Sequence, residues 1–218
     1  MRSRIQESGG QVSDDGEARR PGATRRRGEE LVHAIHDAAI EELLAVGVDR
    51  MTMEGIARRA ATAKTSLYRR WPSPHEVLVD AFLRVFPQEE PSPSTDDLRG
   101  DLVRALRMMR DWMSTLGARA VAEVVTARDR HPELVEAVYA RVFGERGGRF
   151  TQTVLLHYAE HGVVDPARLT PVVLDIGEAL IIKYGLDHDH SVPPDDAYID
   201  AVVDQAILPA LGLPPGGD

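Results

Sequence analysis

The sequence predicts an all-α protein in which an N-terminal three-helix helix-turn-helix domain is joined to a larger C-terminal helical domain. Apolar residues recur at helical spacing through most of the 218-residue chain. Two short helical patterns, separated by a three-residue turn, lie between Met51 and Trp71. No segment shows the alternation of apolar and polar residues that indicates a β-strand. These three observations together favour helices packed on helices.

The first helix is expected to run from about Arg25 to Val46 and to end at Gly47, because glycine readily closes a helix C-terminus. Its apolar stripe is formed by Leu31, Ile35, Ala38, Ala39, Leu43 and Val46. Its polar face is formed by Glu29, Asp37, Glu41 and Glu42. Residues 1–24 are rich in Gly, Ser, Asp and Arg and are expected to form a disordered basic arm.

The junction between this arm and the first helix carries Arg25, Arg26 and Arg27. A flexible basic arm can reach phosphates or a minor groove of DNA. The alternative is a solvated tail, and the sequence leaves both interpretations open.

Residues 52–71 form the predicted helix-turn-helix. Thr52 is a natural N-cap for the first of its helices. The turn is Ala61-Thr62-Ala63, and Pro72 stops the second helix, since proline cannot continue one. That second helix keeps Leu67 for the inner face and presents polar and basic side chains outward, a form that fits a DNA major groove.

Charge is divided unevenly along the chain. The net charge is -9, yet residues 50–70 contain six basic residues and one acidic residue. Residues 1–86 hold 14 basic and 13 acidic residues, whereas residues 87–218 hold 12 basic and 22 acidic residues. DNA binding is therefore expected to depend on a concentrated basic patch in the first 70 residues.

Six further helical segments are expected after the helix-turn-helix. Ser73, Pro74 and Glu76 form a start signal with a capping box for a helix that ends near Phe86. Residues 87–95 form a Pro/Ser linker, and the later helices are expected at 97–116, 118–130, 132–161 with a glycine interruption, 172–186 and 195–211. The segment 172–186 is apolar almost all round, so it needs burial on two sides.

The residues from Thr52 to Phe82, with the helix before them, resemble the DNA-binding domain of the TetR family of repressors. The segments 52–57, 64–68 and 69–73 are similar to the family's second-helix start, recognition helix and exit into the fourth helix. Three positions depart from the family pattern: Ala61 replaces a turn glycine, Ala63 an N-cap serine, and Pro74 a lysine. A left-handed Ala61 would cost about 1 kcal/mol.

The resemblance and the geometry together imply a set of DNA-contacting residues. Lys64, Thr65, Ser66 and Arg69 are expected to face base edges, while Tyr68, Arg70 and Thr52 hold phosphates. In the alternative interpretation, the arginines form the solvated face of an ordinary bundle. The implied partner is double-stranded DNA with a palindromic operator.

The resemblance also implies that residues 97–211 form an effector-binding and dimerisation domain, with helices 172–186 and 195–211 pairing two subunits. The expected effector is a small hydrophobic molecule, because methionine and aromatic side chains make adaptable pocket walls. The candidates are Met109, Trp112, Met113, Phe143, Tyr158 and Tyr184, each of which could equally be a core residue. A DNA-binding organiser without an effector is the alternative.

Other classes of function find weaker support. His157 and His161 stand four residues apart on a predicted helix, as in a metal site, but Tyr158 occupies the position where a zinc protease needs glutamate. The chain has no cysteine, no signal peptide and no apolar run long enough to span a membrane. We therefore expect a cytoplasmic regulator that has no cofactor and is not an enzyme.

Overall fold

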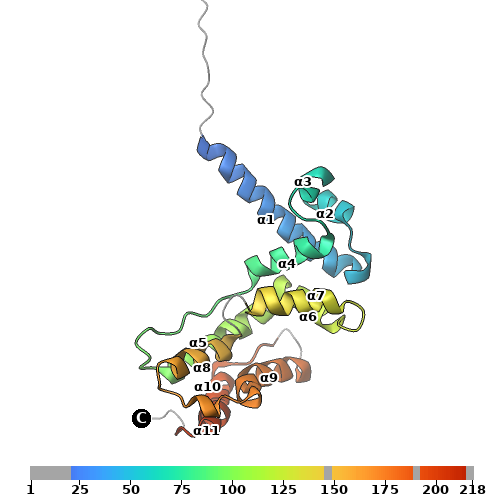
Figure 1. Ribbon diagram of the computed structural model, residues 1–218. Helices are drawn as coiled ribbons and strands as arrows, with labels where there is room; N and C mark the ends of the chain where they lie inside the picture. The colour runs from blue at the N-terminus through green and yellow to red at the C-terminus, as the bar shows by residue number, and fades with distance from the viewer. Residues whose placement is uncertain (1–20, 145–148, 189–191, 215–218) are drawn as a thin grey trace, which may run out of the picture.

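A computed structural model describes residues 21–144, 149–188 and 192–214, with side chains from residue 28 onward. Every regular element in these ranges is a helix, which confirms the predicted fold class. Three helices lie beside the second half of the long α1 at one end of the molecule, and the remaining helices lie below them (Figure 1). None of the described helices is both long and apolar enough to cross a membrane.

Helix α1 (Pro21–Val46) begins at Pro21 rather than at about Arg25. Residues 1–20 of the expected arm lie outside the described residues, and so do the side chains of Arg25, Arg26 and Arg27. Gly47 has a φ of 78° and follows the helix as predicted. A short 3-10 turn, η1 (Val48–Arg50), leads into the next helix.

The next three helices match their sequence signals. Helix α2 (Met53–Arg59) is capped by Thr52, whose Oγ1 accepts a hydrogen bond from the Gly55 amide at 3.0 Å. Helix α3 (Lys64–Tyr68) has no side-chain cap. Helix α4 (Pro74–Val85) is capped by Ser73, which accepts from the Glu76 amide at 3.2 Å. The N-caps therefore set the start of α2 and α4.

The central helices are shorter than the sequence suggests. Helix α5 (Leu98–Met113) ends before Leu116, which is 52% exposed and begins α6 (Leu116–Thr126). The expected segment 132–161 is divided into α7 (Pro132–Ala137), a π-helical segment η2 (Val138–Gly144) and α8 (Phe150–Glu160). A 3-10 turn, η3 (Pro166–Arg168), follows.

The last helices lie at the end of the molecule opposite the helix-turn-helix (Figure 1). Helix α9 (Pro171–Asp187) is capped by Thr170. The expected helix 195–211 is formed by α10 (Asp196–Val202), a π-helical segment η4 (Val203–Ile207) and α11 (Leu208–Ala210). Arg99 of α5 joins this segment through Asp200 at 3.0 Å and Asp204 at 2.7 Å.

One hydrophobic core extends through both domains. The largest fully buried side chains include Ile35, Leu43, Ile56, Leu67, Leu78 and Phe82 around α1, and Leu102, Leu106, Leu155, Tyr158, Ile181 and Ile199 in the C-terminal part. The prediction that Glu42 lies on the polar face of α1 is wrong. Its side chain is buried against α2, where Arg59 Nε donates to Glu42 Oε2 at 2.6 Å.

Candidate nucleic-acid interface

Helix α3 is held against the rest of the domain by a single buried side chain. Leu67 is 0% exposed, whereas Lys64, Thr65, Tyr68, Arg69 and Arg70 are exposed and Ser66 is half-buried. The polar and basic side chains that the sequence singled out therefore lie together on the outer surface. A five-residue helix has little stability of its own, so Leu67 fixes its position.

The cations on this surface differ in what they contact. Lys64 forms an ion pair with Glu54, and its Nζ lies 5.3 Å from the centroid of the Tyr68 ring. The side chains of Arg69 and Arg70 have no hydrogen bond or ion pair to the described part of the chain. Two guanidinium groups are thus available to an anionic partner, while Lys64 must first leave Glu54.

The turn before α3 contains the left-handed residue that the sequence analysis considered at Ala61. Ala61 has a φ of 49°, in the left-handed region that favours glycine. Ala63 precedes α3 in an extended conformation and provides no cap. Both departures from the family pattern are therefore real features of this turn.

A buried polar contact joins α1 to α2 beneath the surface. The Glu42 carboxylate accepts from Arg59 and passes close over Gly55, where a side chain would overlap it. The absence of a side chain at Gly55 thus lets α2 approach α1. This contact joins α1 to the first helix of the helix-turn-helix.

A second polar contact joins α1 to α4. The Asp80 carboxylate lies 3.2 Å from His36 Nε2 and accepts from Trp71 Nε1 at 2.9 Å. Burial, opposed in part by Asp80, lowers the pKa of His36 from its usual value. His36 is therefore held neutral beside Trp71, the residue at which the chain leaves the helix-turn-helix.

Charged groups join the C-terminal domain to the N-terminal domain that carries the helix-turn-helix, which is called the reading domain below. Asp49 of η1 pairs with Arg130 and with His131 Nε2, the latter at 2.7 Å. Arg141 Nη1 of η2 donates to Glu76 Oε2 at the start of α4 at 2.8 Å. The Glu76 carboxylate, which the sequence predicted to complete the capping box, thus bonds Arg141 of the other domain instead.

The segment that carries Arg141 also lines a groove of about 630 Å³ in the C-terminal domain. Its walls come from the linker, η2 and α8, and are formed by Pro91, Tyr139, Phe143, Gly144, Arg149, Gln152, Thr153, Leu156, His157 and Glu160. Apolar and polar groups are mixed along these walls. Such a site suits a small molecule with an apolar body and a few polar groups.

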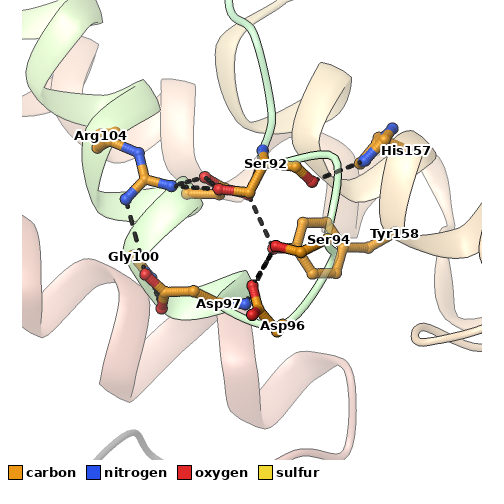
Figure 2. Close-up of polar contacts among 9 residues, drawn as sticks. Ser92, Ser94, Asp96, Asp97, Gly100, Arg104, His157 and Tyr158 are labelled. Carbon is orange, nitrogen blue, oxygen red and sulfur yellow. Dashed lines mark hydrogen bonds and ion pairs between the residues drawn. The ribbon is translucent and has the colours of Figure 1, made fainter.

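A polar network holds the linker wall of this groove in place (Figure 2). Buried Asp101 accepts from the Ser92 amide at 2.8 Å, from the Tyr158 hydroxyl at 2.8 Å, and from Arg104. His157 Nε2 lies 3.2 Å from the Ser92 carbonyl oxygen. The expected Pro/Ser linker is therefore fixed by hydrogen bonds rather than by apolar packing.

The six expected pocket residues are dispersed in the structure. Phe143 lines the groove, and Trp112 lies behind it against Phe86, with ring centroids 5.0 Å apart. Met109 and Tyr158 are buried in the core, Met113 is half-buried against it, and Tyr184 stacks on His188. Tyr139, Arg149, Gln152 and Thr153 were missed, because their proximity arises only when η2 and α8 come together.

The two histidines of the alternative metal interpretation bond to backbone carbonyls. His161 Nδ1 lies 2.8 Å from the His157 carbonyl oxygen, and the two rings are 4.4 Å apart. Among the described residues, no group of three or more His, Asp or Glu side chains is arranged to hold a metal ion. The described geometry gives this alternative no support.

Comparison with known families decides the identity of the fold. Residues 35–81 match the family model described as bacterial regulatory proteins, tetR family. Residues 92–206 match the model of the tetracyclin repressor-like C-terminal domain, which covers more than half of the chain. The chain belongs to the TetR family. It is a DNA-binding transcriptional regulator, and the resemblance seen in the sequence is confirmed.

Individual members of the TetR family extend this match over most of the chain. An uncharacterized HTH-type transcriptional regulator of Mycobacterium tuberculosis is 29% identical over 178 residues, which cover 78% of this chain and 86% of the relative. A DNA-binding transcriptional repressor TetR of Mycobacteroides abscessus is 27% identical, covering 84% and 94%. The crystal structure of the TetR family regulator SCO0332 has a TM-score of 0.56 at 27% identity, covering 83% and 96%.

Proposed function

We propose that this regulator is a homodimeric repressor that binds a palindromic operator and is released by a small hydrophobic ligand. The observation that carries the DNA-binding part is the outer surface of α3, where polar and basic side chains stand on a helix fixed by buried Leu67. A short exposed helix of this kind suits the major groove. Because a regulator must reach its operator DNA, we place the protein in the cytoplasm.

The exposed residues divide into two proposed roles. Lys64, Thr65, Ser66 and Arg69 read base edges, and the ion pair of Lys64 with Glu54 exchanges for a base acceptor on binding. Tyr68, Arg70 and Thr52 hold phosphates, as do Arg25, Arg26 and Arg27 from α1. Base contacts then supply specificity and phosphate contacts supply register.

Helix α9 supports the proposed dimer. Val172 is 74% exposed and Leu186 is 71% exposed, although both are large apolar residues. Only Gly177 and Ile181 of this helix are buried within the described chain. A second subunit that pairs through α9 and the segment 196–210 would cover these side chains and place two α3 helices on half-sites about 34 Å apart.

The groove supports the proposed ligand response because its wall touches the reading domain. Tyr139, Phe143 and Gly144 line the groove, and Arg141 of the same π-helical segment bonds Glu76 of α4. An occupant that repositions η2 would change this bond and the start of α4. The ligand thereby favours one orientation of the helix-turn-helix over another.

Selection of bound sequences from random duplexes at about 0.15 M salt tests the DNA-binding part. We expect a palindrome with half-sites one helical turn apart. Titration of this duplex should show that Lys64→Ala or Arg69→Ala costs about 1–3 kcal/mol and relaxes specificity at one position. Arg70→Ala should instead weaken binding to all sequences alike.

Arg119→Ala is the matched control, because Arg119 is exposed on α6, away from α3. It should leave the operator affinity unchanged. No enrichment of any sequence, with only weak salt-sensitive binding, would remove the proposed operator recognition. An equal loss on all sequences from Lys64→Ala and Arg69→Ala would instead remove the assignment of base contacts.

A further inference from the structure

Two half-buried glutamates adjoin residues of the groove wall and lack full hydrogen bonding. Glu89 of the linker and Glu178 of α9 each have an Oε1 atom that is buried and has no hydrogen-bond partner within the described chain. The other carboxylate oxygen of Glu89 accepts from Thr153 Oγ1 at 3.3 Å, and Thr153 lines the groove. Buried acceptors of this kind are costly unless a partner arrives.

The charges around these oxygens do not balance. Arg149 is the cation that faces Glu178, and its Nη2 lies 3.7 Å from Asp175 Oδ1 and donates to Gln152 Oε1 at 3.1 Å. Glu89, Asp175 and Glu178 supply three carboxyl groups against this one guanidinium. Burial raises the pKa of Glu89, and burial raises the pKa of Glu178 to about 7.

Aromatic rings extend from the groove to the same region. Phe143 in the groove wall lies 4.9 Å from Phe86, which also contacts Trp112 and Phe150 at 5.0 Å and 5.7 Å between ring centroids. The buried Trp112 Nε1 has no partner in the described chain either. Aromatic surface and unfilled hydrogen-bonding positions therefore lie together next to the groove wall.

A fully buried hydroxyl adds an independent observation on the α9 side. Thr151 is 1% exposed, and its Oγ1 has no hydrogen-bond partner among the described residues. This side chain lies against Gly177, the residue before Glu178, where an added Cβ would be 2.9 Å from the hydroxyl. Four of the unpartnered buried atoms thus belong to one region of the C-terminal domain.

We infer that the groove takes an aromatic amine, whose rings contact Phe143 and Tyr139 and whose protonated nitrogen binds the carboxylates of Glu178 and Glu89. This inference rests on the proposed ligand response and names the chemical class of the ligand. The ammonium group supplies N–H donors to both free oxygens and offsets the excess negative charge. An aromatic carboxylate would depend on Arg149, which already bonds Gln152.

Isothermal titration of the full-length protein with three matched probes tests this inference. The probes are 2-(1-naphthyl)ethylamine, 2-(1-naphthyl)ethanol and 1-naphthaleneacetate, which share one ring system and differ in charge. At pH 7.5 the amine should bind at least about tenfold more tightly than the alcohol, the ratio expected of a charged hydrogen bond. Binding should release protons, because Glu178 must ionise beside Glu89, Asp175 and Arg149.

Glu178→Gln should remove the preference for the amine and the proton release. Asp187→Asn is the matched control, since Asp187 is exposed on the same helix, pairs with Lys183 and is not among the charges that act on Glu178, and it should keep both. Equal binding of amine and alcohol, tightest binding of the acetate, no binding of any probe, or a preference that survives Glu178→Gln would each overturn the inference. The titration contains no DNA, so it tests amine binding separately from the ligand response. If the amine binds but does not release the protein from its operator, only the proposed ligand response is wrong.

Discussion

The reading domain and the C-terminal domain are built from the same kind of helix but form their sites in different ways. The α3 surface is made by residues 64–70, which are neighbours in the sequence and are presented by one buried leucine. The groove is made by residues from the linker, η2 and α8, which are far apart in the sequence. The first site is local, whereas the second exists only once the domain has packed.

The two regions also differ in how many of their helix ends and buried charged groups have hydrogen-bond or ion-pair partners. Thr52 and Ser73 cap α2 and α4, and the buried Glu42 has its cation. The C-terminal domain contains two π-helical segments, unpartnered carboxylate oxygens and an exposed apolar face on α9. π-Helical turns are frequent at functional sites. The exposed apolar face of α9 and the unpartnered carboxylate oxygens mark the C-terminal domain as the part that a second subunit or a ligand would complete.

Leu67→Ala should have the largest effect and would break the local site directly. Removal of a fully buried leucine costs about 2–5 kcal/mol of unfolding free energy. Operator binding should be lost at the same time, because α3 has no other anchor of this size. Urea unfolding followed by circular dichroism measures the first effect. Leu116→Ala is the control, and at 52% exposure Leu116 should change stability by less than about 0.5 kcal/mol.

The buried ion pair should respond unequally to removal of its two partners. Arg59→Ala leaves the buried Glu42 carboxylate without its cation and should cost about 2–3 kcal/mol. Glu42→Ala should cost less than this, because Arg59 is partly exposed and water can solvate it. Equal losses in urea unfolding of the two variants would show that the pair is not desolvated as described. Arg58→Ala, on the exposed face of α2, is the control.

The turn before α3 offers a stabilising change of smaller size. Ala61→Gly should raise the unfolding free energy by about 1 kcal/mol, because glycine adopts the left-handed φ of 49° without strain. Ala63→Gly at a φ of -75° is the control and should not stabilise. Thermal unfolding of both variants measures the difference. A decrease for Ala61→Gly would mean that the turn is not strained.

The contrast explains which features could be predicted from the sequence. Thr52, Ser73 and Gly47 act on their own helix ends, so the boundaries of α2 and α4 and the end of α1 follow from local chemistry. The exposed residues of α3 follow from the position of Leu67 alone. The fold class and the family could also be predicted, because their signals are local sequence patterns.

The features that the sequence did not reveal depend on contacts between distant segments. Glu42 fits the polar stripe of α1 by periodicity and is buried only because Arg59 and Gly55 lie opposite it. The assignment of Met109 and Tyr158 to a pocket came from residue type, which does not distinguish a core from a groove. Arg149 and Thr153 carry no local signal of the groove that they line.

A change of pH should alter the stability of the two regions in opposite directions, and this effect should be smaller than those of the substitutions above. The pKa of His36 is lowered in the fold, so below its unfolded value of 6.5 the unfolded chain binds a proton that the native chain does not. Stability of the reading domain should therefore fall as the pH drops below about 6.5.

Glu178 should act in the opposite direction, because its pKa is raised to about 7 from 4.5. Between these values the unfolded chain is ionised while the native chain keeps its proton, so its contribution to stability falls as the pH rises. Urea unfolding from pH 5 to 8 should show that His36→Gln removes the loss on acidification and Glu178→Gln the loss on alkalinisation. His161→Gln, at an exposed position at the end of α8, should change neither slope. If His36→Gln left the acid slope unchanged, the neutral His36 beside Asp80 and Trp71 would not be what makes the reading domain sensitive to acid.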